Sequence, residues 1–251
     1  MPITLRTDHG PVTTIDDWAA AIPPKQWKDG RSARALARAW WPEGRRASEP
    51  DEFAALLDSG GFVGLTLGSI HVHPTIPVDD TSWIADLAIA AHCEDGPLAI
   101  VVDAIADERF GDRLGNVLVD AARAIGRDEA SPVVGRIQRL ATALLPPWKA
   151  GLPHLEELRH DLLMGAAATM AYAASIGATR AVYVVHELVY LDRTKESDRR
   201  KNREELDLFV RRLSHGEEQR LKRGVLLGSI ARPGYPEIAL QVGKARRDLD
   251  R

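Results

Sequence analysis

The sequence predicts one domain of mixed α/β class, in which helices cover the faces of a central sheet. Three observations predict this class. The chain has 251 residues, which is enough for one large α/β domain. Its 45% hydrophobic and 27% charged residues are typical of a globular protein. Strand-like apolar runs gather in the middle of the chain, and segments with helical spacing lie on both sides of them.

Three helices are predicted before this central region. The run "TTIDDWAAAI" indicates a short capped helix that ends at Pro23 and Pro24. In "GRSARALARAWW", Ser32 is the expected N-cap of an amphipathic helix. In "SEPDEFAALLDSGG", Pro50 and two acids occupy the first turn, and glycines follow the last.

Strands and further helices are predicted along the rest of the chain. Three strands are expected in "FVGLTLGSIHVHPTI", "SWIADLAIAAH" and "PLAIVVDAIA". Helical spacing returns in "RLGNVLVDAARAIG" and "GRIQRLATALL", and "LPHLEELRHDLLMGAAATMAYAASIGA" indicates one long apolar helix. A buried strand in "TRAVYVVHELVY", an amphipathic helix and two closing strands complete the chain. No repeat or low-complexity linker interrupts it, so residues 1–251 are expected to form a single domain.

The central order of helix, three strands, helices and strand coincides with three sequence motifs. They are "WKDGRSARALARAW", "ADLAIAAHCEDGPLAIVVDAIADERFGD" and "LRHDLLMGAAATMAYAASIGATRAVYVVHE", and together they span most of residues 25 to 190. In order and spacing they resemble an uncharacterised bacterial family of the PD-(D/E)xK, or restriction-endonuclease-like, nuclease superfamily. The resemblance implies an αβββαβ core over residues 49–192, a helical extension over 1–48, and a C-terminal helix and strands over 193–251.

The resemblance also implies a metal-dependent phosphodiesterase site. Asp86 falls on the first acidic position of the family pattern and Asp103 on the second, where Glu is commoner. Both would be ligands of Mg²⁺ or Mn²⁺, because hydrolysis of a phosphodiester needs oxygen-ligated cations. DNA or RNA would then be the substrate or partner. A lysine two residues after the second acid would project from the same strand face and assist the attacking water.

Two departures from the family pattern indicate weakened or lost catalysis. Ile105 occupies the position of that lysine, and Asp161 stands where the family usually has Gln. Removing one preorganised electrostatic group costs on the order of 10²–10³ in rate. Arg159 and His160 on the predicted long helix, or Lys149 before it, are the candidates to replace the lysine. The alternative is a non-catalytic nuclease-fold scaffold that binds nucleic acid or a protein partner.

Other patterns predict less specific roles. His71 and His73 share a strand face at a spacing that suits zinc, so a zinc-dependent hydrolase is a third alternative without a recognisable third ligand. For His186, at the end of a buried strand, a hydrogen-bonded structural role is favoured. The basic run over residues 193–203 alternates with acids, which favours a solvated helix face over phosphate binding.

Charge and cysteine content restrict the environment of the protein. The formal net charge is −3, so nucleic acid would have to bind a local basic patch. A single cysteine, Cys93, excludes an internal disulfide framework and suits a reducing compartment. Charged residues interrupt every apolar run before it reaches membrane-spanning length. A cytoplasmic protein without a membrane partner is therefore expected.

Overall fold

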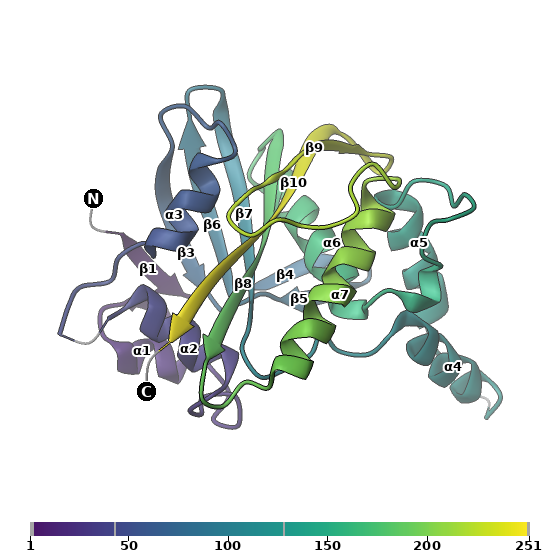
Figure 1. Ribbon diagram of the computed structural model, residues 1–251, viewed down its shortest axis with the longest axis horizontal. Coiled ribbons are helices and arrows are strands. Elements are labelled where there is room, and N and C mark those ends of the chain that lie inside the picture. The colour runs from purple at the N-terminus through teal and green to yellow at the C-terminus, as the bar shows by residue number, and fades with distance from the viewer. Residues whose placement is uncertain (1–2, 43, 128, 250–251) are drawn as a thin grey trace.

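A large mixed sheet forms the centre of the computed structural model, which describes residues 3–42, 44–127 and 129–249 (Figure 1). Within these ranges the sheet has eight strands in the order β2-β1-β3-β6-β7-β8-β10-β9. Their bounds are β1 Thr4–Thr7, β2 Gly10–Val12, β3 Thr66–Val72, β6 Leu87–Cys93, β7 Gly96–Ile105, β8 Arg180–Tyr190, β9 Leu227–Arg232 and β10 Tyr235–Leu249. The strands β3, β6 and β7 pair antiparallel, whereas β7, β8 and β10 run parallel.

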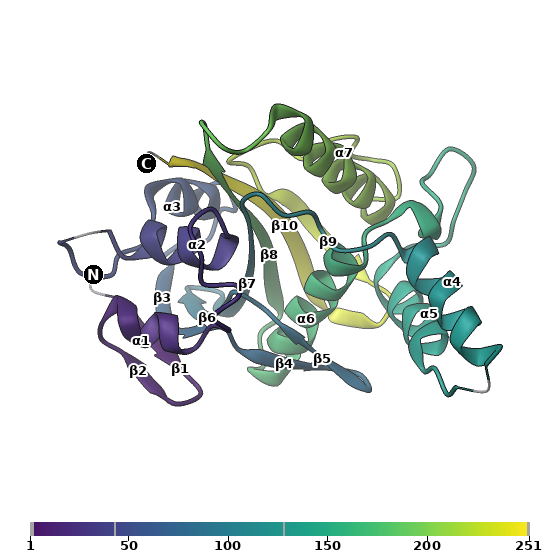
Figure 2. The ribbon, with the colours of Figure 1, turned by 90° about the horizontal axis from the view of Figure 1, so that it is seen from below.

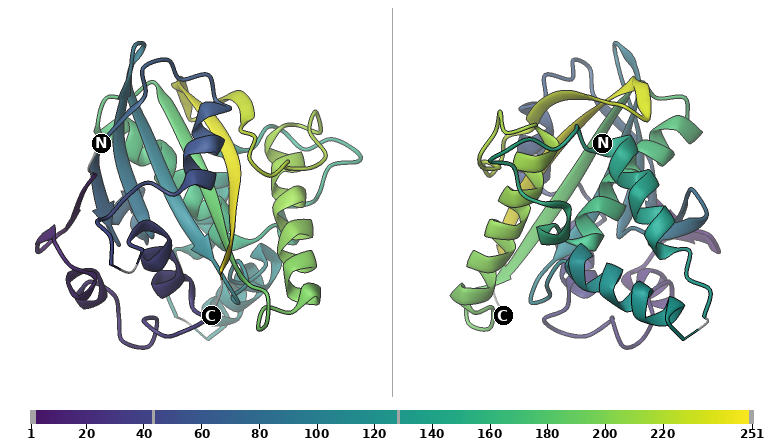
Figure 3. Two further views of the ribbon diagram at one scale, coloured as in Figure 1. Left: turned by 60° about the vertical axis from the view of Figure 1, so that its left-hand side comes forward. Right: turned by 90° about the vertical axis from the view of Figure 1, so that its right-hand side faces the viewer.

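Helices cover both faces of this sheet. Their bounds are α1 Ile15–Ala20, α2 Ser32–Trp40, α3 Asp51–Asp58, α4 Leu114–Ile125, α5 Val133–Leu144, α6 His160–Ser175 and α7 Glu196–Leu213. The helices α4 and α5 lie at the opposite end of the molecule from α1 and α2 (Figures 1 and 2). Figure 3 shows the same arrangement from two further sides. The predicted fold class, a mixed sheet with flanking helices and C-terminal strands, is confirmed.

Two apolar cores result from the alternation of side chains along the central strands. Val101 and Val185 belong to the core under α5, α6 and α7, whereas their neighbours Ile100 and Val184 belong to the core under α1, α2 and α3. Successive residues of a strand point to opposite faces, so a strand covered on both faces must be apolar almost throughout. This requirement explains why β7 and β8 read as nearly continuous apolar runs.

The predicted strands over residues 62–76 and 82–92 are each broken in the structure. His73 has a positive φ of 52°, and the chain turns there before Pro74. A separate two-stranded sheet follows, made of β4 Thr75–Val78 and β5 Thr81–Ile84. The chain then leaves this hairpin through Ala85 and Asp86 and enters β6. Asp86 therefore lies in a break between strands and not within one.

Three further predictions needed correction. The single long helix predicted over residues 152–178 is instead a 3-10 turn at Leu155–Glu157 followed by α6, because Leu158 and Arg159 are extended. Ser32 is the first residue of α2 and not its N-cap, which is Arg31. The region over residues 1–48, expected to be a helical extension, also contains the strands β1 and β2.

Candidate functional site

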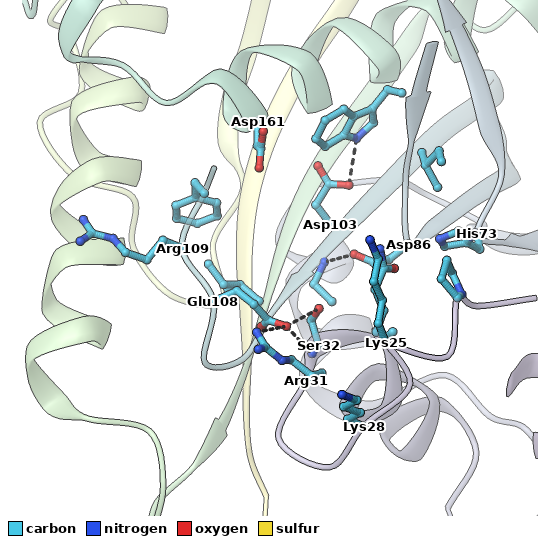
Figure 4. Close-up of a pocket in the computed structure, with 18 of the residues that line it drawn as sticks. Lys25, Lys28, Arg31, Ser32, His73, Asp86, Asp103, Glu108, Arg109 and Asp161 are labelled. Atoms are coloured by element: carbon cyan, nitrogen blue, oxygen red, sulfur yellow. Dashed lines mark hydrogen bonds and ion pairs between the residues drawn. The ribbon is translucent and has the colours of Figure 1, made fainter. Parts of the chain in front are cut away.

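A cavity of about 670 Å³ opens on the face of the sheet that carries α6, beside the N-terminal loop before α2 (Figure 4). It is lined by Pro23, Lys25, Gln26, Lys28, Arg31, Ser32, Ala33, His73, Trp83, Ile84, Asp86, Asp103, Ala104, Ile105, Glu108, Arg109, Phe110, Asp161 and Tyr183. Figure 4 shows Lys25, Asp86 and His73 on one side of the cavity and Arg109 on the other. The structure thus brings both predicted metal ligands, Asp86 and Asp103, into one cavity.

Asp86 is held in place by backbone hydrogen bonds on three sides. Its N–H donates to the Val102 carbonyl at 3.1 Å, and its carbonyl accepts from the His73 N–H at 2.9 Å. Its carboxylate Oδ2 accepts from the Ala104 N–H at 2.7 Å. Burial raises the pKa of Asp86 to about 7; the Ala104 hydrogen bond opposes this rise and the charge of Glu108 adds to it.

Asp103 lies near the end of β7, and both of its carboxylate oxygens accept hydrogen bonds. Trp83 Nε1 donates to Oδ1 at 3.3 Å, and the Tyr183 hydroxyl donates to Oδ2 at 2.9 Å. Burial raises the pKa of Asp103 to about 8, and the charge of Asp86 is the next largest cause. The carboxylate of Asp86 is therefore close enough to disfavour the ionised form of Asp103.

The helix α6 packs closely against Asp103 because Gly165 has no side chain. A Cβ atom at this position would overlap both Asp103 Oδ2 and the Tyr183 hydroxyl. The absence of a side chain at Gly165 therefore lets the helix pack directly over the Asp103–Tyr183 hydrogen bond.

We expect Gly165→Ala to lower the free energy of unfolding by about 1–3 kcal/mol, because the added methyl group displaces buried polar atoms. The matched control is Gly135→Ala in α5, where a Cβ atom would meet only the flexible guanidinium of Arg139, at 3.3 Å. That control is expected to gain up to about 1 kcal/mol from helix propensity. Urea denaturation measures both variants. A Gly165→Ala variant as stable as the native chain would show that α6 has room to move away from Asp103.

Ile105 forms an apolar part of the cavity wall two residues after Asp103. Its side chain is only 4% exposed and packs in the same core as Phe110 and Val185. It can neither donate a hydrogen bond nor carry a charge. This wall of the cavity therefore supplies no cation beside the two carboxylates.

Free positive charge enters the cavity from the N-terminal loop instead. Lys25 and Lys28 are exposed lining residues, and neither forms an ion pair with any residue that the structure describes. Arg31, in contrast, pairs with Asp107 and Glu108 at 3.8 and 3.7 Å, and Arg109 pairs with Glu205. The two lysines are thus the lining cations that remain available to an anionic ligand.

Glu108 fixes the loop that carries these lysines. Its Oε1 accepts hydrogen bonds from the backbone N–H and the hydroxyl of Ser32, at 3.2 and 3.4 Å. Its Oε2 accepts from the N–H groups of Ala106 and Asp107, both at 3.2 Å. Glu108 therefore accepts a hydrogen bond from the first turn of α2, where backbone N–H groups lack partners within the helix. It also connects this helix to the segment that follows β7.

The three residues proposed to replace the missing lysine do not line this cavity. Arg159 is buried, pairs with Glu205 and donates to the Gly111 carbonyl at 2.7 Å. The Nδ1 atom of His160 lies 3.2 Å from Asp161 Oδ1. Asp161 lines the cavity, whereas His160 does not. Lys149 lies in the loop between α5 and α6, also outside the lining. Arg159 is thus a structural ion-pair partner of α7.

The histidines singled out in the sequence have different direct contacts. His71 Nε2 contacts Asp8 at 3.1 Å, whereas His73 lines the cavity after the chain has turned. His186 is buried on the other face, where its Nε2 lies 2.9 Å from Glu52 Oε1, as expected of a structural histidine. In residues 3–42, 44–127 and 129–249, no group of three or more His, Cys, Asp or Glu side chains is arranged to hold a metal ion. A zinc site therefore has no three-ligand set in this part of the chain.

Sequence reasoning missed several residues that complete the cavity. Trp83 and Tyr183 orient Asp103 from a hairpin and from the neighbouring strand, and neither position carries a local signal of that role. Lys25 and Lys28 flank the start of the "WKDGRSA" motif, so this motif was the available signal. The motif indicated that this loop is important, but it did not indicate that the two lysine side chains line the cavity.

The fold and the cavity define a mixed α/β protein with paired carboxylates and free lysines on one face of its central sheet. The chain belongs to the family described as Domain of unknown function (DUF6946), whose model matches residues 11–248. No curated protein and no solved structure matches the chain. Across the described residues, no helix has the length and apolar character needed to cross a membrane.

Proposed function

We propose that this chain is a PD-(D/E)xK-like phosphodiesterase that acts on DNA or RNA with Mg²⁺ or Mn²⁺. The observation that carries the proposal is the pair of partly buried carboxylates, Asp86 and Asp103, in a cavity that two exposed lysines also line. Ile105 occupies the position at which the superfamily places its lysine, so the rate is expected to be lower than that of a complete site. In the proposal Lys25 takes part of that role from the N-terminal loop before α2.

The residues present fit a divalent cation with two protein ligands. Mg²⁺ commonly keeps several waters and binds through one or two carboxylates together with substrate phosphates. Asp86 Oδ1 accepts no hydrogen bond from the described residues, and the oxygens of Asp103 retain lone pairs beyond those used by Trp83 and Tyr183. A cation between the carboxylates would also relieve the like-charge interaction that raises the pKa of Asp103.

Each side chain then has a defined task in hydrolysis. A bound divalent ion would activate water and neutralise charge on the phosphate. Trp83 and Tyr183 hold the carboxylate of Asp103 in one orientation, and the Ala104 N–H does the same for Asp86. Lys25 donates to a non-bridging phosphate oxygen. Lys28 contacts a neighbouring phosphate of the nucleic acid, so it affects substrate binding more than the rate of cleavage.

A non-catalytic scaffold is the second candidate, and one observation favours it. Both oxygens of Asp103 already have hydrogen-bond partners, so this carboxyl group is satisfied without a cation. Together with Ile105, this arrangement suits a protein that binds nucleic acid through Lys25 and Lys28 and does not cleave it.

A cleavage assay separates the two candidates. Labelled single- and double-stranded DNA and RNA are incubated with the native chain and Mn²⁺ or Mg²⁺. We expect the native chain to cleave these substrates. Lys25→Gln should reduce the rate roughly 100-fold, which is the typical effect of removing one preorganised electrostatic group from an enzyme site. The matched control Lys28→Gln, from the same exposed loop, is expected to lose less than about tenfold through weaker binding.

Two results would contradict the phosphodiesterase proposal. Cleavage that persists unchanged in Asp103→Asn would assign the activity to another site or to a contaminant. Native chain that binds the oligonucleotides without cleaving them, with binding weakened equally by Lys25→Gln and Lys28→Gln, would establish the scaffold instead.

A further inference from the structure

Another cavity, of about 280 Å³ and with a basic lining, lies between α7 and β10. It is lined by Glu187, Glu196, Arg199, Arg203, Leu221, Arg223, Lys244 and Arg246. The lining thus carries five cationic side chains and two acidic ones, in a chain whose net charge is −3. Such a local excess of one sign attracts ligands of the opposite sign.

The sheet register relates this cavity to the carboxylate site. Asp103 on β7 pairs with Val185 on β8, and Val185 pairs with Lys244 on β10. Paired residues of parallel strands project to the same face, so Lys244 shares the face of Asp103 at about 10 Å, two strand spacings away. Ile105 and Phe110 lie between the two cavities, as part of a small apolar pocket that Lys244 also lines.

Lys244 is the central cation of this cavity. The residue is only 8% exposed, and its ammonium group forms no hydrogen bond or ion pair with any residue that the structure describes, although its carbonyl accepts from the Gly224 N–H at 2.9 Å. Burial lowers its pKa, while the nearby charges of Glu187 and Asp207 oppose that change and those of Arg203 and Arg246 add to it. Because the residue is largely buried and lines the cavity, its ammonium group is held there in a partly desolvated position, where an anionic ligand would compensate its charge.

Of the four lining arginines, Arg246 pairs with Asp248 at 2.8 Å, whereas the other three are incompletely paired with the described residues. Arg203 has no ion-pair partner in the described chain, and Arg223 donates only to the Arg246 carbonyl, at 2.9 Å. Arg199 pairs with Glu196, but its Nε is buried without a hydrogen-bond partner. Arg199 and Arg203 belong to the basic run for which a solvated face was predicted; here they face a cavity.

We propose that this cavity binds a phosphate group with at least two negative charges, either on a small phosphorylated molecule or at the end of a polynucleotide. Arginine forks and a lysine ammonium together match the oxygens of phosphate. The volume lies just below the usual range for pockets of drug-sized ligands, which favours a small charged group. The site does not depend on the metal-ion proposal, because it shares no lining residue with the carboxylate cavity.

Calorimetry on the full chain without added metal tests this site, with inorganic phosphate, pyrophosphate and sulfate as ligands. We expect saturable binding, tighter for pyrophosphate than for phosphate. Lys244→Met and Arg203→Gln should each weaken it by roughly tenfold or more, the usual effect of losing one charge-assisted hydrogen bond. The matched control is Arg200→Gln, an exposed position on α7 outside the lining, which should bind as the native chain does.

Two further experiments test whether the phosphate belongs to a polynucleotide end or to a small molecule, and whether this site is independent of the carboxylate cavity. An oligonucleotide that binds more tightly with a 5′-phosphate than with a 5′-hydroxyl assigns the site to polynucleotide ends; equal binding assigns it to small phosphorylated molecules. Asp103→Asn should bind pyrophosphate as tightly as the native chain does. A failure of the nuclease proposal would leave that result unchanged.

The proposal is overturned if the native chain shows no saturable binding of phosphate or pyrophosphate. It is also overturned if Arg200→Gln weakens binding as much as Arg203→Gln, since that would indicate general charge attraction. Should Lys244→Met fail to fold, the exposed Arg203→Gln decides between the outcomes.

Discussion

The protein without divalent metal is expected to lose stability as the pH rises from about 4 to about 8, and Asp103→Asn is expected to remove much of this loss. In the folded chain the pKa values of Asp86 and Asp103 are raised from 3.8 to about 7 and about 8, mainly by burial. Between these values and 3.8 the folded state holds protons that the unfolded chain releases. Stability therefore falls with rising pH through this window and is level above it.

The expected size follows from the same values. Raising the pKa of Asp103 from 3.8 to about 8 corresponds to at most about 6 kcal/mol of stability lost at high pH. An asparagine avoids this loss because it is never ionised, and its amide can still bond with Trp83 and Tyr183. At pH 8.5 Asp103→Asn should thus be at least about 1 kcal/mol more stable than the native chain, whereas at pH 4 the difference should be small.

Urea denaturation with a chelator, at several pH values, measures this effect. The matched control is Asp16→Asn, an exposed carboxylate in the first turn of α1, which should not change the slope of stability with pH between 5 and 8. A native chain whose stability is level or rising across this window would contradict the account. So would an Asp103→Asn variant that is destabilised equally at pH 5 and pH 8.5.

The order of the main elements was predictable because burial imposes simple patterns. The strands β7 and β8 are covered on both faces, so their sequences are almost entirely apolar, and α2 and α3 carry a clear apolar stripe. The breaks at His73 and Leu158 were not predictable from these patterns. Apolar residues continue on both sides of each break. Pro74 was the one sequence signal for the first break, since proline is excluded from the middle of a sheet, whereas the extended backbone at Leu158 and Arg159 had no such signal.

The candidate site was predictable only in its acidic half. Asp86 and Asp103 follow from the resemblance to the superfamily, and the structure places them in one cavity. The basic half depends on contacts between distant parts of the chain. Glu108 holds Ser32, 76 positions away in sequence, and this contact brings the lysine loop to the cavity. Arg159 and His160 were proposed for that role because the long helix that carries them was expected to flank the sheet, but Arg159 pairs with Glu205 and neither residue lines the cavity.

The native chain is expected to bind Mn²⁺ at the carboxylate pair, and binding should release protons near pH 7. The carboxyl groups of Asp86 and Asp103 have pKa values of about 7 and about 8 without metal, and a cation must displace their protons. Affinity should therefore rise from pH 6 to pH 8, by up to about tenfold per pH unit for each proton released. Buffers with different ionisation enthalpies report the number of protons in the same titration.

The most direct test of the central claim is calorimetry with Mn²⁺ and Mg²⁺ on the native chain, Asp86→Ala and Asp103→Ala, with Asp16→Ala as the matched control. Circular dichroism confirms that each variant is folded. The account predicts saturable Mn²⁺ binding by the native chain and by Asp16→Ala, and a loss of at least about 100-fold in affinity in either cavity variant, since each removes one of two protein ligands. Folded native chain that binds neither ion, or binding that survives both substitutions, would contradict the existence of a metal site at this carboxylate pair.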